Sequence, residues 1–217
     1  MDATAERRPS ETPKQAERRE RIEKAAYEVL EEVGYNSASL LVIAKRASAS
    51  NETLYKWYGN KQGLFRALVE SNAKQAATLL EGALAGDGKP LETLAQLGPV
   101  LLSLVTSGRA VVLNRAAAGD VSDTGTLGRS IAEAGRDTIA PLLRSLLLRA
   151  RHAGEIEFDT PEDAAETYFH LLIGDLQIRR VIGAIDALTE VEIQSRSDRA
   201  YRKFLTLYGP GGKRGDG

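Results

Sequence analysis

The apolar residues of this 217-residue chain recur every three or four positions, and this spacing narrows its possible folds more than any other feature. Such spacing lines apolar side chains along one face of a helix, whereas a half-buried strand requires alternation with a period of two. Runs of that second kind are almost absent over the length of a strand. The sequence therefore predicts an all-α body, with 42% hydrophobic residues to fill its core.

Four helices are expected in the N-terminal third. The first covers residues 22–33 and ends before Gly34, which suits the position after a helix end. The second follows Ser39, a good N-cap residue, and the third follows Ser50 after a three-residue turn. The fourth is long and covers residues 60–84.

Further helices are expected beyond the glycine-containing segment AGDGKP, over residues 91–106, 109–118, 126–152, 161–182 and 189–208. The start at Pro161 is the best marked, because a capping residue precedes this proline and two acidic residues follow it. Residues 1–15 carry two prolines and few apolar groups, and residues 209–217 are rich in glycine. Both ends are therefore expected to be flexible.

Composition excludes several classes of protein. The chain has no cysteine, which rules out disulfides, thiolate metal sites and thiol nucleophiles and suits a reducing compartment. It has no long apolar run, and its first residues lack the apolar core of a secretory signal, so we expect a cytoplasmic protein with no membrane partner. Since the formal net charge is only -1, binding to nucleic acid requires positive charge that is gathered locally.

The order of the early helices is that of a helix-turn-helix DNA reader, whose second short helix enters the major groove. Residues 25–65 read AAYEVLEEVGYNSASLLVIAKRASASNETLYKWYGNKQGLF. This stretch resembles the N-terminal domain of TetR-family transcriptional repressors in its GY turn, its IA pair, its TLY triplet with a following aromatic position, and the lysine that opens the fourth helix. The resemblance implies a helix-turn-helix domain over residues 16–66 and a helical ligand-binding and dimerisation domain over residues 67–208.

Two places depart from the family pattern. Family members often carry glycine where this chain has Ser48, so the turn is expected to differ slightly or to be strained. Leu41 and Val42 stand where polar residues are usual, and this apolar pair is expected to be buried against the first or the fourth helix.

The candidate DNA contacts are Ser39, Ser50, Asn51, Glu52, Thr53, Tyr55, Lys56, Trp57 and Lys61. In the groove, Asn51 can pair with adenine and Lys56 can donate to guanine, whereas Glu52 either accepts from cytosine or only stabilises the start of its helix. Trp57 could contact a sugar, a phosphate or a thymine methyl group, and the sequence does not decide among these three. The basic residues within 18–24 alternate with glutamates, which favours ion pairs on a solvated face over DNA contacts.

The other candidates face the phosphate backbone. Tyr55, Thr53 and Ser39 present hydroxyl groups that can bond to phosphate, although Ser39 serves equally well as an N-cap. Lys61 opens a helix, where the helix dipole disfavours a cation, so a DNA phosphate is expected to offset this cost. Tyr58 occupies a position that the family usually buries, and we expect it in the core.

The larger C-terminal region gives less specific signals. Its last two helices, over residues 161–182 and 189–208, carry apolar and aromatic side chains that suit a four-helix dimer interface. Candidate ligand contacts are Leu101, Leu104, Asn114, Arg115, Leu146 and Tyr168, although aliphatic stripes form plain core more often than ligand sites. His152 and His170 are expected to be structural or exposed, and neither a metal nor a cofactor is expected.

Together these features predict a homodimeric TetR-like regulator, a repressor that binds a pseudo-palindromic double-stranded DNA operator and is released by a small-molecule effector. An enzyme is disfavoured, because the sequence offers neither a nucleophile with its base nor carboxylates paired in a cleft pattern. The alternative is a helical adaptor or orphan regulator of the same fold, without ligand-controlled operator binding.

Overall fold

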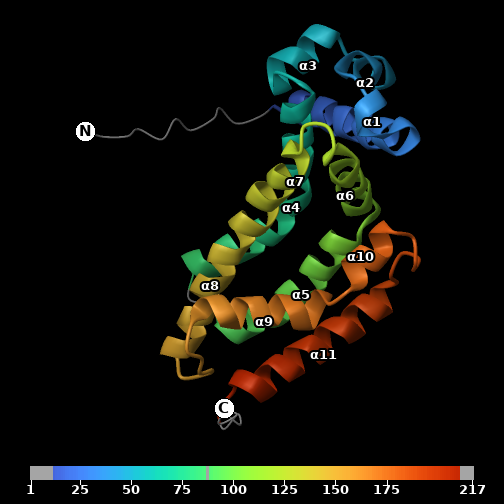
Figure 1. Ribbon diagram of the computed structural model, residues 1–217. Coiled ribbons are helices and arrows are strands. Elements are labelled where there is room, and N and C mark those ends of the chain that lie inside the picture. The colour runs from blue at the N-terminus through green and yellow to red at the C-terminus, as the bar shows by residue number, and fades with distance from the viewer. Residues whose placement is uncertain (1–11, 87, 211–217) are drawn as a thin grey trace.

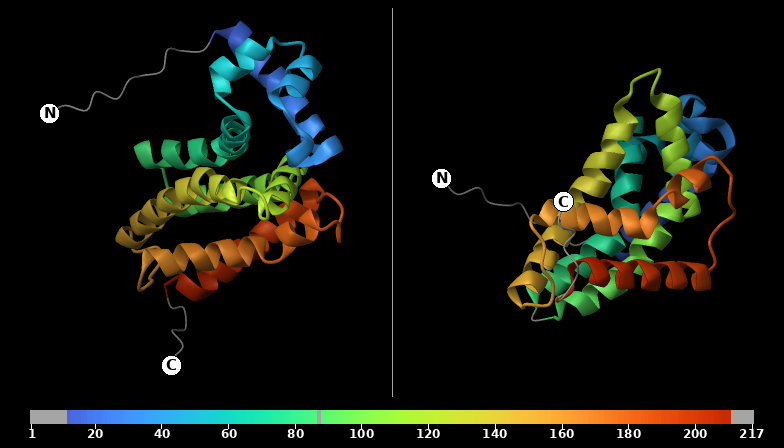
Figure 2. Two further views of the ribbon diagram at one scale, coloured as in Figure 1. Left: turned by 45° about the horizontal axis from the view of Figure 1, so that its top comes forward. Right: turned by 60° about the horizontal axis from the view of Figure 1, so that its bottom comes forward.

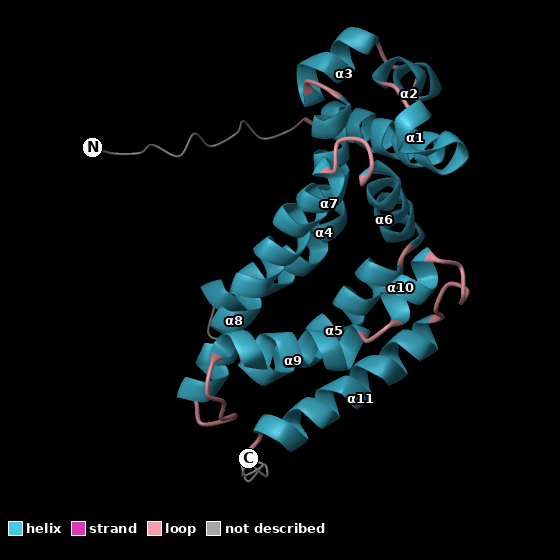
Figure 3. Cartoon of the chain, viewed as in Figure 1, coloured by secondary structure: helices cyan, strands magenta, loops and turns pink. Residues whose placement is uncertain are grey.

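The computed structural model describes residues 12–86 and 88–210, and every regular element within these ranges is helical (Figure 1, Figure 3). The expected all-α fold is therefore confirmed. The first elements are α1 (Pro13–Ser37), α2 (Leu40–Arg46), α3 (Asn51–Tyr58) and α4 (Lys61–Ala85). They are followed by α5 (Pro90–Thr106), α6 (Gly108–Asp120), α7 (Thr126–Ile131), the π-helical turn η1 (Ala132–Arg136), α8 (Asp137–His152), α9 (Pro161–Ile173), α10 (Leu176–Val181) and α11 (Glu190–Tyr208).

A first core holds α1, α2, α3 and the start of α4 together, at the top of Figure 1. It is built from side chains at helical spacing that are almost inaccessible to solvent, among them Ile22, Val29, Ile43, Leu54 and Phe65. Within α3, Leu54 is the one buried residue. This helix therefore buries one side chain fully and leaves Glu52, Tyr55 and Lys56 exposed to solvent.

A second core lies below the first and is enclosed by α4, α5, α8, α9 and α11 (Figure 1, Figure 2). At its centre the rings of Tyr168 and Phe204 meet edge to face, with centroids 5.5 Å apart. The buried Tyr168 hydroxyl donates a hydrogen bond to the Leu94 backbone oxygen at 2.9 Å. One contact set therefore joins α5, α9 and α11.

Two helix boundaries differ from the sequence prediction. Residues 1–15 were expected to form the flexible arm, yet α1 begins at Pro13, because Thr12 and Gln15 form a reciprocal capping box. The helix expected over residues 161–182 is interrupted at Gly174, which has a φ of 53°, and the chain continues as α10. Residues 1–11 of the expected arm and 211–217 of the expected tail lie outside the described residues.

The helix expected over residues 126–152 forms over its whole length, but it contains the π-helical turn η1. Gly34 breaks the regular geometry of α1 with a φ of 71°, at the position where the sequence predicted the helix end.

Within the described residues, no single helix is long and apolar enough to cross a membrane. α5 and α6 meet that criterion only as a pair, across a bend of 51°. The apolar side chains of α5 are largely buried in the second core, for example Leu94, Leu97 and Leu102.

Candidate nucleic-acid interface and cavity

Capping residues fix both ends of α3. The Ser50 hydroxyl accepts a hydrogen bond from the Thr53 backbone N–H at 3.1 Å and lies 2.8 Å from the Thr53 hydroxyl. At the other end Gly59 stops the helix with a φ of 74°. Ser50 and Thr53 are thus engaged with each other, so a phosphate contact by either would come in addition to the cap.

The side chains of Glu52, Tyr55 and Lys56 lie on the exposed side of α3, and Tyr55 is 54% exposed. Glu52 lies in the first turn and Lys56 in the last, which are the positions where the helix dipole favours an anion and a cation. Both charges therefore stabilise α3 itself as well as being available to DNA. The side-chain oxygen of Asn51 is buried without a hydrogen-bond partner, so pairing with adenine requires this amide to turn outward.

Trp57 and Tyr58 both pack against the first core. Their rings meet edge to face with centroids 6.4 Å apart, and the Arg19 guanidinium lies 5.8 Å from the Trp57 ring centroid. Trp57 therefore joins α3 to the early turns of α1. Tyr58 packs against the core, as the sequence predicted.

Lys61 is held within the protein. Its Nζ donates hydrogen bonds to the backbone oxygens of Tyr35 at 2.9 Å and of Asn36 at 3.4 Å, and it lies 4.1 Å from the Tyr35 ring centroid. Burial, with contributions from the Asp120 and Asp123 carboxylates, raises the pKa of Tyr35 to about 12, so this ring stays uncharged. These carbonyl groups therefore offset the cost of a cation at the start of α4, for which the sequence predicted a DNA phosphate. A phosphate contact by Lys61 stays a prediction.

The expected burial of Leu41 and Val42 is wrong, since they are 50% and 43% exposed. The reason is that α2 docks on α1 through other groups: Arg46 donates two hydrogen bonds of 2.8 Å to the Glu32 carboxylate. Ser39 is an N-cap, because its hydroxyl accepts from the Val42 backbone N–H at 3.2 Å.

A cavity of about 480 Å³ opens between the helices that connect the two cores. Its twenty lining residues are Val69, Asn72, Ala73, Leu101, Leu104, Val105, Ala110, Leu113, Asn114, Gly128, Ile131, Ala132, Gly135, Arg136, Ile139, Phe169, His170, Ile173, Gly174 and Gln177. They come from α4, α5, α6, the α7–η1–α8 segment and the α9–α10 junction. We call this space the central cavity.

The predicted ligand contacts fall into three places. Leu101, Leu104 and Asn114 line the central cavity. Leu146 and Tyr168 are buried in the second core and do not line it. Arg115 borders a different hollow.

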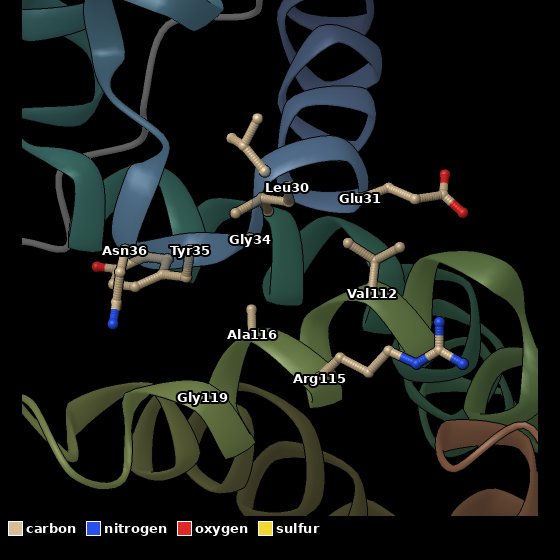
Figure 4. A pocket seen from close by; sticks show the side chains of 10 residues that line it. Leu30, Glu31, Gly34, Tyr35, Asn36, Val112, Arg115, Ala116 and Gly119 are labelled. Atoms are coloured by element: carbon tan, nitrogen blue, oxygen red, sulfur yellow. The ribbon is translucent and has the colours of Figure 1, made fainter.

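That hollow, of about 360 Å³, lies between the end of α1 and α6 (Figure 4). Figure 4 shows the Arg115 guanidinium directed away from Tyr35 and Asn36. Its Nε donates a hydrogen bond to the Val181 backbone oxygen at 2.8 Å, so Arg115 ties α6 to the end of α10.

Several lining residues were missed by sequence reasoning, above all those of η1 and of the α9–α10 junction. His170 was expected to be structural or exposed; it is exposed and also borders the cavity. Nothing in the local sequence marks η1 as a π turn. Among the described residues, no group of histidine and acidic side chains is arranged to hold a metal ion.

α6 belongs to both halves of the molecule. Its residues Leu113, Ala116 and Ala117 are part of the first core, together with Leu127 of α7. Leu113 also lines the central cavity, alongside Ala110 and Asn114. The helix that borders the cavity therefore completes the core under the helix-turn-helix unit.

Asp120 fixes the loop between α6 and α7. This fully buried carboxylate accepts hydrogen bonds from the backbone N–H groups of Thr126 at 3.0 Å and Leu127 at 3.1 Å, and from the Thr124 hydroxyl at 2.8 Å. Burial acts to raise the pKa of Asp120, but the hydrogen bonds from Thr124 and the backbone outweigh it and hold the pKa below its ordinary value. Gln62 of α4 reaches the same loop by donating to the Thr126 hydroxyl at 3.2 Å.

Comparison with known proteins gives two family matches. Residues 22–68 match the bacterial regulatory proteins of the tetR family, and residues 92–210 match the C-terminal domain of AefR-like transcriptional repressors. A curated protein, the uncharacterized HTH-type transcriptional regulator YvkB of Bacillus subtilis (strain 168), is 32% identical over 82 residues. That match covers 38% of this chain and 42% of the other protein.

Solved structures share the fold over most of the chain. The crystal structure of a TetR-family transcriptional regulator from Mesorhizobium loti is 25% identical with a TM-score of 0.74, and the match covers 92% of this chain and all of the other. SmeT in complex with triclosan is 21% identical with a TM-score of 0.72, and here the match covers 90% of this chain and 93% of the other.

Proposed function

The chain belongs to the TetR family of transcriptional regulators, and from this we propose that it is a homodimeric repressor released from its operator by a small molecule in the central cavity. The proposed operator is pseudo-palindromic, with α3 of each subunit in successive major grooves about 34 to 36 Å apart. The proposed place of action is the cytoplasm, where that DNA lies.

The dual packing of α6 carries this proposal. The same helix lines the central cavity and completes the first core, so a ligand that displaces α6 changes the support of the helix-turn-helix unit. The Arg115 bond to Val181 extends the connection to α10. Such coupling between a ligand and DNA amounts typically to about 1–3 kcal/mol, and it acts equally in both directions.

The chemistry of α3 supports recognition of DNA. Lys56 and Tyr55 provide an exposed cation and a hydroxyl group, and Lys61 places a second cation at the start of α4. The proposed base contacts are Asn51, Lys56 and Glu52, and the proposed phosphate contacts are Tyr55, Thr53, Ser39 and Lys61.

The proposed dimer forms through the outer faces of the last helices. Exposed apolar side chains occur along α10 and α11 and on the segment that joins them, namely Ile178, Ile182, Val191 and Leu207. Burial of such residues favours association, and two helices from each subunit would form a four-helix interface. SmeT, which shares the fold, forms a complex with triclosan, and this supports a small-molecule effector for this chain.

A gel-shift assay tests the proposal, with the DNA upstream of the gene for this protein, a random duplex of equal length, and several salt concentrations. Lys61→Ala should weaken binding to both duplexes alike and reduce the salt slope by about one unit. Lys74→Ala, which removes an exposed lysine further along α4, is the control for the loss of one positive charge and should change neither.

Two outcomes are decisive. No sequence-selective, salt-dependent binding by the wild type would overturn the repressor proposal and favour the helical adaptor. Equal DNA binding by wild type and Lys61→Ala at every salt concentration would remove only the phosphate contact assigned to Lys61.

A further inference from the structure

The central cavity combines an apolar interior with a mouth that is bordered by an arginine and a histidine. Among its twenty lining residues, the ionisable ones are Arg136 and His170, and none carries a carboxylate. We propose that the effector is a small apolar acid, whose hydrocarbon body fills the cavity and whose carboxylate binds at Arg136 and His170. This inference rests on the proposed effector role of the cavity.

The interior suits a hydrocarbon body. Its walls carry branched aliphatic groups and one ring, namely Val69, Leu101, Leu104, Val105, Leu113, Ile131, Ile139, Phe169 and Ile173. A space of about 480 Å³ lies within the range of small-molecule sites. Burying an apolar tail against these walls supplies affinity without selecting a particular head group.

Selection of the head group falls to the mouth. Arg136 Nη2 and His170 Nε2 both lie 3.7 Å from the same Glu166 oxygen, which is too long for a hydrogen bond. Two groups that can carry positive charge thus share one carboxylate, and that carboxylate lies outside the lining. Their N–H groups can therefore donate hydrogen bonds to the carboxylate of a ligand.

The π turn places Arg136 at this mouth. Each backbone hydrogen bond of η1 spans one more residue than in an α-helix, and this changes which side chains face the cavity. Gly135 and Ala132 of the turn present little bulk to the cavity, and Arg136 borders it. The acidic residue of the turn, Glu133, instead pairs with Arg66 at 3.8 Å and does not line the cavity. The turn therefore directs its base, and not its acid, to the ligand.

A cationic or neutral ligand finds less in this lining. A cation would meet Arg136, and the nearby Glu166 carboxylate is already shared between Arg136 and His170. A neutral polar group could use the amides Asn72, Asn114 and Gln177, but Asn114 already donates to the Ala110 backbone oxygen at 2.8 Å. The N–H donors of Arg136 and His170 therefore favour an acid.

Three probes with ten carbon atoms each test the head group: decanoate, decan-1-ol and decylammonium. Calorimetry with the full chain at about pH 7.5 keeps the first anionic and the last cationic. Decanoate should bind about three- to tenfold more tightly than decan-1-ol, as expected for a charge-assisted contact at an exposed mouth. Decylammonium should bind most weakly.

Variants localise the effect. Arg136→Gln should remove the preference for decanoate and leave decan-1-ol within about twofold, whereas Arg129→Gln, an exposed arginine of α7 that does not line the cavity, should change neither. Glu166→Gln should tighten decanoate, because it removes the competing carboxylate. Leu104→Trp, which fills the cavity, should weaken all three probes.

The proposal is overturned if decanoate and decan-1-ol bind the wild type equally, if no probe binds, if Arg136→Gln keeps the preference, or if Leu104→Trp binds decanoate unchanged. If all three probes bind the wild type equally and none binds Leu104→Trp, the acidic head group is rejected but the cavity is kept as the effector site. Operator binding is measured separately by gel shift without probes, so its failure would reject the repressor function and not the calorimetric preference.

Discussion

Ser48→Gly is expected to stabilise the protein. Ser48 is the one non-glycine residue with a positive φ in the described ranges, at 50°. It follows α2 in a motif in which the Ala49 N–H bonds to the Ala44 oxygen at 2.9 Å, and the Ser48 N–H bonds to the Lys45 oxygen at 3.3 Å. This pair of bonds requires a left-handed residue after the helix end.

The chain uses the same motif twice more, with glycine in the left-handed position. After α8 this residue is Gly154 with a φ of 71°, and after α10 it is Gly183 with a φ of 76°. The residues before Ser48 and Gly154, namely Ala47 and Ala153, have nearly identical angles, with φ of -78° in both. Gly154 is therefore a matched reference for Ser48 within one protein.

The magnitude follows from two opposing terms. The left-handed conformation costs a residue with a Cβ about 1–2 kcal/mol. Glycine in turn loses about 0.5–1 kcal/mol more conformational entropy on folding. Because the Ser48 side chain is exposed, little packing is lost, and the net gain in the free energy of unfolding is about 0.5–1 kcal/mol. For a chain of this size that corresponds to a rise in Tm of about 1–4 °C.

Urea denaturation followed by circular dichroism measures this gain, at one fixed protein concentration because the protein is proposed to be a dimer. The reciprocal variant Gly154→Ser should lose a similar amount. Ala153→Gly, at a negative φ, should be slightly destabilised. If Gly154→Ser is destabilised while Ser48→Gly gains nothing, Ser48 is not strained and the reasoning fails.

Three further predictions concern single side chains. Asp120, whose folded pKa lies below the ordinary 3.8, contributes stability that is fully present above that value and is lost as pH falls through the folded pKa. Asp120→Asn should therefore unfold at lower urea at neutral pH, and its midpoint should change less than that of the wild type between about pH 5 and pH 2; equal pH profiles would refute this. Tyr168→Phe should lose about 1–2 kcal/mol in the free energy of unfolding, because the buried Leu94 oxygen loses its donor, and an unchanged urea midpoint would contradict that role. Asn51→Ala should lower the ratio of operator to random-DNA affinity in gel shifts by about tenfold, with little change in the random-DNA affinity, and a uniform loss on both duplexes would reject the base contact.

Local patterns were enough to predict most helices. The starts at Ser50 and Thr160 and the break at Gly34 follow from capping groups and glycine, which act within a few residues. The interruption at Gly174 is also marked by a glycine, but a distant group contacts it as well, because Arg196 of α11 donates to the Leu172 oxygen at 2.9 Å. The 161–182 pattern contains no sign of that partner.

The candidate sites likewise depend partly on local sequence and partly on groups that are distant in the chain. Apolar spacing identifies which side of α5 is buried, but it does not reveal where packing leaves a void. Leu104 and Leu146 therefore look alike in sequence, although one lines the central cavity and the other is closed in the core. The sequence predicts a phosphate contact for Lys61, because no local pattern marks the carbonyl groups of Tyr35 and Asn36, far away in the chain, as its partners.

The packing of α6 limits how far the DNA reader can be treated as an interchangeable module. Leu113, Ala116, Ala117 and Leu127 complete the hydrophobic core beneath α1 and α4, although they lie well beyond the helix-turn-helix in sequence. A chimeric regulator that joins residues 16–66 to a foreign effector domain would expose that core unless the foreign α6 and α7 offer matching side chains. Recombination between relatives is therefore expected to preserve function when the reader and this α6–α7 surface are inherited together.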